Sequence, residues 1–376
     1  MAIIDSWYRW YPALLTRIYY RRVSVVRLGS IPQTGPVFCV GLHRNGAVDG
    51  MVYKTVVPKA TFLVSVQLLR NPIARIFFTG IPVTRSKDVG DRSENAASLA
   101  RCVEHLRGGG TLFVLPEGTS DLGPRHLPFH SGAARILAAA RAEGIQPAVI
   151  SFGIFYRRPD GFRSDVVVVV GHPFSDDITT ALEDIGVNVD SAAALGRIER
   201  AAALRSGDDL AAYYPALKRL EPRADDPVLI DRSAKVDALI ASRVLATERG
   251  VPVFSTRPMA WSIAWLAFQV PIVVAAAIAN AGPLIAGWAA GRRFADARNT
   301  ITLWRLLIGA PVAMLWVAGV LAAAIVGRSI WLVPAYAIIT IAGLIVYPEL
   351  LARWPRLKNA MAPTEARAAV EALRES

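Results

Sequence analysis

The chain has 376 residues and a formal net charge of +12; 53% of its residues are hydrophobic and only 19% are charged. Soluble domains carry about 25% charged residues, so this composition excludes an ordinary cytosolic protein, and its hydrophobicity excludes an intrinsically disordered one. The two cysteines, Cys39 and Cys102, are too few for a disulfide framework or a four-thiolate zinc site. We therefore expect a chain that works at a membrane.

Aromatic residues and arginines alternate over residues 1–23, where we expect an amphipathic helix. They are Trp7, Tyr8, Arg9, Trp10, Tyr11, Arg17, Tyr19, Tyr20, Arg21 and Arg22. Aromatic rings favour the headgroup layer and arginine favours anionic lipid, so the pattern predicts a membrane-surface helix. The same residues are also compatible with stacking on single-stranded nucleic acid, or with a core helix that exposes a basic face.

Short strand-forming segments alternate with helical segments over residues 24–175. We expect strands at 23–28, 36–40, 61–65, 111–115, 148–155 and 166–170, and helices at 71–78, 94–106 and 133–142. This alternation, with nearly continuous apolar strands, predicts an α/β domain with a largely parallel sheet flanked by helices. Functional residues then belong in loops at one edge of that sheet.

A histidine and a carboxylate, His43 and Asp49, follow the predicted strand 36–40. Neutral imidazole accepts a proton near pH 7, while a neighbouring carboxylate fixes its tautomer and stabilises the imidazolium that forms. The pattern suits general-base catalysis. A surface histidine beside a helix-capping aspartate would give the same pattern.

A second polar loop, residues 80–87, contains Arg85 and Lys87. An arginine after a short strand can hold a phosphate through two hydrogen bonds, and a nearby lysine adds positive charge. The alternative is that both residues are ordinary solvated cations.

A third polar loop follows the predicted strand 111–115 and contains Glu117, Gly118, Thr119 and Ser120. A glutamate at the carboxyl end of an apolar strand, followed by a flexible glycine and two hydroxyls, suits a site that positions a polyol. The alternative is that the hydroxyls cap the start of a helix.

Evidence for a metal site is weak. His126 and His130 have the i, i+4 spacing of metal ligands on one helix face, but Pro128 between them disfavours a helix there. The sequence contains no HExxH, P-loop or G-x-S-x-G motif. We therefore expect no metal and no cofactor.

The most apolar part of the chain lies after residue 260. Residues 306–327 contain no charged residue and are long enough to cross about 30 Å of hydrocarbon. A second uncharged run, 329–348, follows Arg328, and an earlier run, 260–291, is interrupted by Asn280-Ala281-Gly282-Pro283. A polar, charged and helical segment over residues 176–256 precedes these runs.

The basic residues that flank these runs predict a topology. If basic loops stay cytoplasmic, the last two runs form a hairpin with Arg328 outside. The first run then re-enters the membrane or lies in the interface. We expect membrane-embedded helices over residues 257–358, followed by a cytoplasmic tail over 359–376.

Together the three loops resemble the motifs of glycerolipid acyltransferases, the family of 1-acylglycerol-3-phosphate and glycerol-3-phosphate acyltransferases. In chain order they give a His…Asp loop, a G-x-x-x-x-R loop and a P-E-G-T-S loop, and residues 146–150 resemble a late strand segment of that family. The resemblance covers residues 24–175 and implies the family's glycerol-3-phosphate acyltransferase-like α/β fold.

The resemblance also implies a role for each motif. His43 would be the general base, and Asp49 would orient it. Arg85 and Lys87 would bind the phosphate of the acceptor. The residues that would hold the rest of the acceptor are Glu117, Gly118, Thr119 and Ser120.

By this resemblance the chain is an O-acyltransferase that moves a fatty acyl chain from an acyl thioester to the hydroxyl of lysophosphatidate. The thioester donor is acyl-CoA or acyl carrier protein, and glycerol-3-phosphate or another lysolipid stays open as acceptor. A lipid or thioester hydrolase and a non-enzymatic membrane scaffold are the alternatives. We expect membrane phospholipid and lysophospholipid as partners, no nucleic acid, and a cytoplasmic catalytic domain at a cell membrane of the bacterial type.

The first motif departs from the family pattern. The family has four residues between the histidine and the aspartate, whereas five separate His43 from Asp49. On a helix one extra residue would rotate the carboxylate by about 100°. Because Asn45-Gly46 favours a turn, we expect a bulge before the helix starts to absorb the extra residue. Alternatively Asp49 is displaced and another acceptor, such as Asn45, orients His43.

Overall fold

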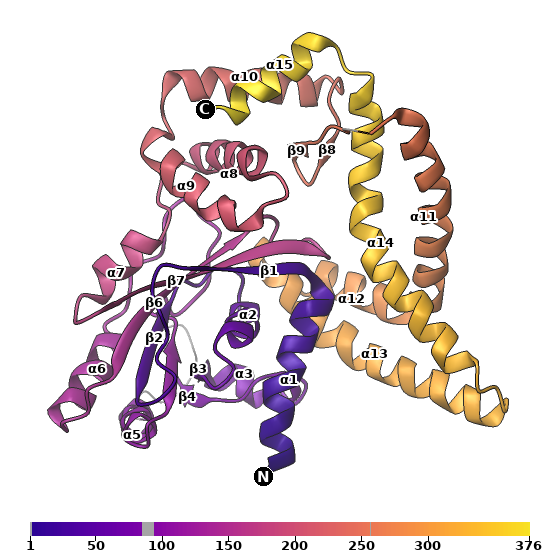
Figure 1. Ribbon diagram of the computed structural model, residues 1–376. Helices are drawn as coiled ribbons and strands as arrows, with labels where there is room; N and C mark the ends of the chain where they lie inside the picture. Colours follow the sequence, from indigo (N-terminus) through magenta and orange to yellow (C-terminus); the bar gives the residue numbers. More distant parts are fainter. Residues whose placement is uncertain (1, 85–93, 256) are drawn as a thin grey trace. The chain divides into compact units, whose positions relative to one another are not determined.

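The structure, a computed structural model, describes residues 2–84, 94–255 and 257–376. The chain divides into two units (Figure 1). The first unit contains Met1–Asp160, Asp165–Asn188 and Ala297–Leu303. The second contains Gly161–Ser164, Val189–Asp296 and Trp304–Ser376.

Seven strands of the described residues form one sheet in the order β1-β7-β6-β2-β5-β3-β4. They are β1 (Tyr20–Arg27), β2 (Val37–Gly41), β3 (Thr61–Ser65), β4 (Ile81–Val83), β5 (Thr111–Val114), β6 (Ala148–Tyr156) and β7 (Ser164–Phe174). The pairs β2–β5, β2–β6, β3–β5 and β3–β4 are parallel, and β6–β7 is antiparallel. The predicted α/β fold with a largely parallel sheet is therefore confirmed.

Both faces of the sheet are buried, which explains why its strands read as continuous apolar runs. All five residues of β2 are buried, and so are the five valines Val166–Val170 of β7. Figure 1 shows α5 (Glu94–Arg107), α6 (Gly132–Ala142) and α7 (Ile178–Ile185) on one side of the sheet, and α1 (Ala2–Tyr19) and α2 (Val48–Val56) on the other.

The helix predicted over residues 71–78 is shorter than expected. The chain forms α3 (Val66–Arg70), breaks, and then forms α4 (Ala74–Phe77). The break occurs at Asn71, which precedes a proline and therefore avoids the helical region. Asn71 Oδ1 accepts hydrogen bonds from the backbone N–H groups of Ile73 (2.9 Å) and Ala74 (3.1 Å), so it caps the next helix.

The N-terminal helix α1 is amphipathic and packs into the first unit. Its buried face includes Tyr11 and Leu15. The opposite face exposes Trp10, Leu14 and Ile18, which are 48%, 41% and 37% exposed and four residues apart. This spacing places an apolar stripe along the exposed side of the helix.

The second unit contains a polar helical part. Its elements are α8 (Ala192–Ser206), α9 (Tyr213–Leu220), α10 (Pro227–Ala241), the two-stranded β8 (Thr247–Glu248) and β9 (Val251–Pro252), and α15 (Thr364–Arg374). Arg232 on α10 donates a hydrogen bond to the carbonyl of Ala372 on α15 (2.8 Å). The last helix of the chain is thus packed against the predicted helical segment 176–256.

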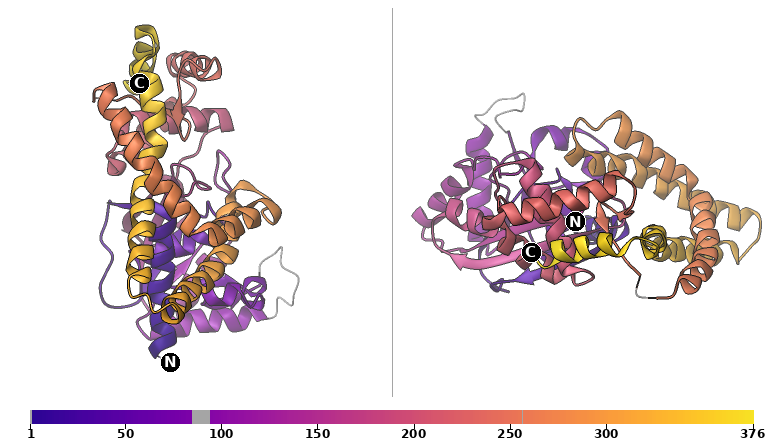
Figure 2. Two further views of the ribbon diagram at one scale, coloured as in Figure 1. Left: turned by 90° about the vertical axis from the view of Figure 1, so that its right-hand side faces the viewer. Right: turned by 90° about the horizontal axis from the view of Figure 1, so that it is seen from above.

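The described residues include three helices that are long and apolar enough to cross a membrane by length and composition: Met259–Ala279, Arg298–Val326 and Leu332–Ala360. They correspond to α11, to the 3-10 turn Arg298–Thr300 with α13 (Ile301–Val326), and to α14. Figure 2 shows α11 and α14 side by side along most of their length.

The chain turns at Asn280, between α11 and α12 (Ala281–Arg293). Asn280 Nδ2 donates to Thr340 Oγ1 (3.0 Å), and Asn280 Oδ1 accepts from the Tyr336 hydroxyl (2.6 Å). Trp316 Nε1 on α13 donates to the carbonyl of Ala279 (2.8 Å). The turn therefore lies beside the middle of α13 and the apolar half of α14.

Candidate active site

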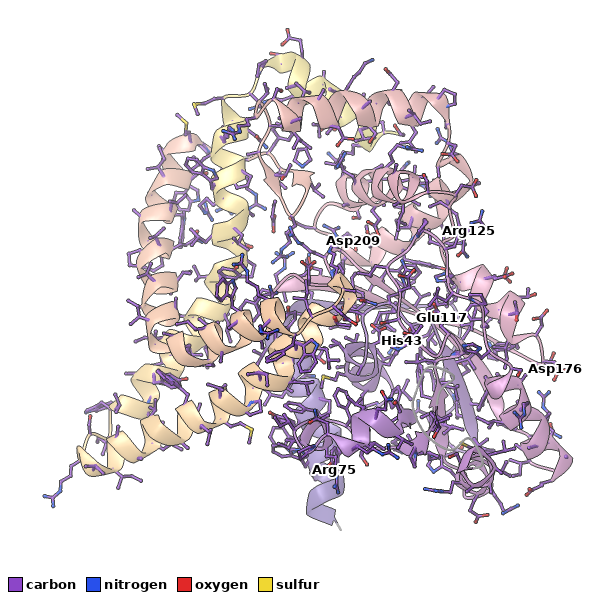
Figure 3. All side chains as sticks on the ribbon, turned by 180° about the vertical axis from the view of Figure 1, so that it is seen from behind. His43, Arg75, Glu117, Arg125, Asp176 and Asp209 are labelled. Atoms are coloured by element: carbon purple, nitrogen blue, oxygen red, sulfur yellow. The ribbon has the colours of Figure 1, made fainter. Side chains whose placement is uncertain are left out.

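Two of the polar loops meet at one edge of the sheet. Strands β2 and β5 are parallel neighbours, so residues 42–47 and 115–120, which follow them, leave the sheet at the same edge. Figure 3 shows His43 and Glu117, one from each loop, close together. The carboxyl edge of a parallel sheet is where such folds place their sites.

His43 and Asp49 form a buried pair. The distance from His43 Nδ1 to Asp49 Oδ2 is 2.9 Å; His43 is 8% exposed and Asp49 is 0% exposed. Residues 42–47 are not helical, and α2 begins at Val48 with Asp49 in its first turn. The extra residue is thus absorbed before the helix, with Gly46 at φ +60°. The side chain of Asn45 points elsewhere, donating to the Tyr20 hydroxyl (2.9 Å).

The carboxylate of Asp49 accepts three further hydrogen bonds. The backbone N–H groups of Arg44 (2.6 Å) and Asn45 (2.8 Å) donate to Oδ2, and the Tyr156 hydroxyl donates to Oδ1 (2.5 Å). Burial raises the pKa of Tyr156 well above its ordinary value, so its hydroxyl keeps the proton that it donates. These bonds offset the cost of burying a carboxylate and fix its direction. With Nδ1 of His43 donating to Asp49, Nε2 carries the free lone pair.

Tyr156 is a site residue that the sequence analysis missed. It lies at the end of β6, 107 residues after Asp49, in a strand that reads as an ordinary core strand. The one available signal is the position of a tyrosine at the carboxyl end of a predicted strand, beside the strand that carries the histidine.

Glu117 joins the two loops. It is 1% exposed, its Oε1 accepts from the backbone N–H of His43 (2.7 Å), and its Oε2 accepts from the backbone N–H of Leu127 (3.1 Å). Burial raises the pKa of Glu117, and the two N–H donors oppose that rise. The backbone of the His43 loop is therefore held from one side by Asp49 and from the other by Glu117.

The rest of the third loop continues outward from Glu117. Gly118 has φ +65°, and a Cβ atom there would lie 3.0 Å from His130 Cδ2, so the turn requires glycine. Thr119 and Ser120 are partly exposed beyond it. The backbone N–H of Asp121, the next residue, donates to the carbonyl of His43 (3.2 Å), which keeps this loop against the histidine.

Residues 22–152, which contain this pair and its surrounding loops, match the family model described as acyltransferase. This part of the chain is an acyltransferase domain. The resemblance is confirmed at the level of the acyltransferase family, and this domain makes the chain an acyltransferase enzyme.

Among solved structures, the chain is similar to the 1-acyl-sn-glycerophosphate (LPA) acyltransferase PlsC from Thermotoga maritima. The two are 19% identical, the TM-score is 0.33, and the match covers 46% of this chain and 68% of that one. A search of curated proteins with the sequence finds no match. The assignment of the acyltransferase domain rests on the family match.

Two predicted site residues of the acyltransferase domain, Arg85 and Lys87, lie outside the described residues. In the described ranges, no group of three or more His, Cys, Asp or Glu residues is placed to hold a metal ion. The structure therefore brings together His43, Asp49 and the loop from Glu117 to Ser120.

The raised pKa of Glu117 predicts a pH dependence of stability. Between the unfolded-state pKa of about 4.3 and the raised folded-state value, the folded protein binds the proton of Glu117 more tightly. Its contribution to the free energy of unfolding is thus fully present at low pH and falls as pH rises through this window. Because Glu117→Gln removes the titration, the Tm of the wild type minus that of the variant should fall across this window.

Thermal unfolding in detergent, followed at intervals from pH 4 to 8, measures this difference. Subtracting the variant cancels the titration of other carboxylates, such as Asp165, whose pKa is lowered by its arginine partners. A difference that rises with pH would contradict the prediction, because the fold would then favour the ionised form of Glu117.

Proposed function

We propose that this acyltransferase transfers a fatty acyl chain from an acyl thioester to the hydroxyl of lysophosphatidate. The observation that carries the proposal is the pair His43–Asp49, in hydrogen-bond contact at the carboxyl edge of the sheet. A base that accepts a proton on Nε2 while its Nδ1–H is held by a buried carboxylate is suited to activating a hydroxyl.

The reaction needs one proton carrier and no covalent intermediate. His43 Nε2 takes the proton of the acceptor hydroxyl, and the oxygen attacks the thioester carbonyl. Asp49 stabilises the imidazolium. When the tetrahedral intermediate collapses, the C–S bond breaks, and the proton on His43 passes to the leaving thiolate. The product is an ester and a free thiol.

The two cysteines support direct transfer. Cys39 and Cys102 are 0% and 1% exposed. Burial raises the pKa of the Cys39 thiol far above its ordinary value, and raises that of Cys102 to about 11. Neither thiol is therefore accessible or ionised enough to become an acyl-cysteine nucleophile.

The acceptor would be held by the other two loops. Arg85 and Lys87 would bind its phosphate, since an arginine can form two parallel hydrogen bonds to phosphate oxygens. Gly118, Thr119 and Ser120 would hold its glycerol end, with Glu117 fixing their loop against His43. Acyl-CoA or acyl carrier protein would supply the acyl chain, and the reaction uses no cofactor.

The apolar parts of the chain suit an acceptor that resides in a membrane. The stripe Trp10, Leu14 and Ile18 on α1 offers aromatic and aliphatic side chains to the headgroup layer. The turn at Asn280, beside the middle of α13, supports a re-entrant hairpin of α11 and α12 next to two spanning helices. A single-chain phospholipid would then reach the site by diffusion along the bilayer, with glycerol-3-phosphate as the alternative acceptor.

An acceptor panel tests the proposal. The full-length protein in nanodiscs is given radiolabelled acyl-CoA or acyl carrier protein, with lysophosphatidate, glycerol-3-phosphate and other lysolipids offered separately. We expect phosphatidate from lysophosphatidate, and at least a thousandfold loss of turnover in His43→Ala. Retained turnover in that variant would rule out the general base. Free fatty acid released without any acceptor would instead indicate a hydrolase.

Removal of the partners of His43 should give a graded loss. Asp49→Asn places an amide against several N–H donors and leaves His43 without its carboxylate, so we expect kcat to fall roughly 10³- to 10⁴-fold, as in other base–carboxylate pairs. Tyr156→Phe removes one hydrogen bond to a charged group, worth about 1.5 kcal/mol, so roughly a tenfold fall is expected. Wild-type kcat in Asp49→Asn would show that another group orients His43.

Arg85→Ala tests the phosphate site. Hydrogen bonds to a charged group contribute about 1.5–3 kcal/mol, so the KM for lysophosphatidate should rise roughly 10- to 100-fold while the donor KM stays unchanged. Arg135→Ala, which removes an exposed arginine of α6, is the charge-matched control and should change neither KM. An effect of Arg85→Ala confined to the acyl donor would contradict the phosphate role.

A further inference from the structure

A connector of seven residues, Ala297–Leu303, lies between apolar helices in the sequence. It nevertheless belongs to the first unit, which contains the acyltransferase domain and is called the acyltransferase unit below. They form the 3-10 turn Arg298–Thr300 and the first residues of α13. The sequence alone assigns this segment only to a basic flank of the membrane helices. Its contacts place it in the active site.

Asn299 contacts both catalytic loops. It is 9% exposed, and its Nδ2 donates to the carbonyl of Ser120 (2.8 Å) and to Ser120 Oγ (2.9 Å). Its own carbonyl oxygen lies 3.2 Å from the place that a Cβ atom would take on Gly46. One residue of the connector therefore bears on the loop of His43 and on the loop of Glu117.

The segment is anchored on either side of Asn299. Thr302 is fully buried, and its hydroxyl donates to the carbonyl of Pro159 (2.8 Å). The same carbonyl accepts from Asn45 Nδ2 (3.1 Å), in the His43 loop. Arg298 Nε forms an ion pair with Asp160 (3.0 Å). Asn299 is thus held in place by neighbours that do not themselves touch Ser120.

One of the two hydrogen bonds constrains the Ser120 hydroxyl, and the other holds its backbone carbonyl. Because Nδ2 of Asn299 occupies a lone pair of Ser120 Oγ, the hydroxyl proton must point away from Asn299. Within the described part of the chain, that proton is donated to no protein group. Ser120 is partly exposed, and the residue after it is bonded to His43. The Ser120 hydroxyl can therefore offer its proton to a bound molecule, and it lies in a loop that is hydrogen-bonded to the backbone of His43.

We propose that Asn299 is a positioning residue for the acceptor: it aims the Ser120 hydroxyl at a glycerol or phosphate oxygen of the acceptor and holds the P-E-G-T-S loop in register with His43. This rests on the proposed function, since it takes the third loop as part of the acceptor site. A purely structural Asn299 would instead secure the connector without affecting which substrate is bound.

Two substitutions separate these roles. Asn299→Ala removes both hydrogen bonds. Asn299→Asp replaces the donor with a carboxylate that accepts the Ser120 proton and so takes it away from the substrate. In both variants we expect the acceptor KM to rise at least tenfold, with the donor KM within twofold of the wild type. Arg135→Ala, which removes an exposed arginine of α6 outside both loops and outside this segment, is the control and should leave both constants unchanged.

A double-mutant cycle with Ser120→Ala tests whether Asn299 acts through that hydroxyl. In the Ser120→Ala background, Asn299→Asp should raise the acceptor KM by a clearly smaller factor than in the wild-type background, because only the bond to the carbonyl of residue 120 is then left to lose. Fully additive effects, or equal rises in the donor and acceptor KM, would overturn the proposal.

Amide hydrogen exchange gives a readout that does not need activity. Peptides covering residues 116–123 should exchange at least threefold faster in Asn299→Ala than in the wild type or Arg135→Ala, while peptides of β2 and β6 stay unchanged. Unchanged exchange of residues 116–123 would overturn the positioning role even in an active enzyme. A wild type that is inactive with every acceptor would refute the proposed function instead, and the exchange result would still decide whether Asn299 holds the loop.

Discussion

The buried carboxylate of Asp49 is the constraint on which the site depends. A carboxylate with no exposed surface is tolerated only when its lone pairs are filled, and here the donors are His43, two backbone N–H groups and Tyr156. These hydrogen bonds hold the backbone of residues 43–45 around Asp49 Oδ2 and link the end of β6 to the start of α2. The same hydrogen bonds that offset the cost of burying this carboxylate also fix the tautomer and the ring orientation of His43.

Glu117 holds the backbone of the same histidine. Asp49 binds the side chain of His43, whereas Glu117 binds its backbone N–H, so the histidine is held at two points by two different loops. Burial dominates at Glu117 and raises its pKa, because its two N–H donors compensate only in part. A site assembled in this way is oriented before substrate arrives, which lowers the cost of reorganisation during the reaction.

The sequence predicts the parts of the site that lie close together along the chain. Runs of valine, isoleucine and phenylalanine predict the parallel sheet, and Asn45-Gly46 predicts the bulge that keeps Asp49 within reach of His43. Tyr156 and Asn299 are different, because their contacts with Asp49 and Ser120 span 107 and 179 residues. No local periodicity encodes such pairs, and both residues have ordinary local explanations: a core strand and a loop between apolar helices. The helix Val66–Arg70 before Asn71 is not predicted, because its five residues are too few to show a helical periodicity.

The connector also bears on which side of the membrane the chemistry occurs. Arg298 lies within Ala297–Leu303, and Arg292, Arg293 and Arg305 flank it. Arginines beside apolar helices tend to be retained on the cytoplasmic face. That stretch is part of the acyltransferase unit, through Asn299 and Thr302. The topology expected from the positive-inside rule would therefore put His43 on the cytoplasmic face, because these residues belong to the same unit as His43. This expected topology agrees with the proposed donors, since acyl thioesters on coenzyme A or acyl carrier protein are bulky and polar and would reach such a site only from the compartment in which they are made.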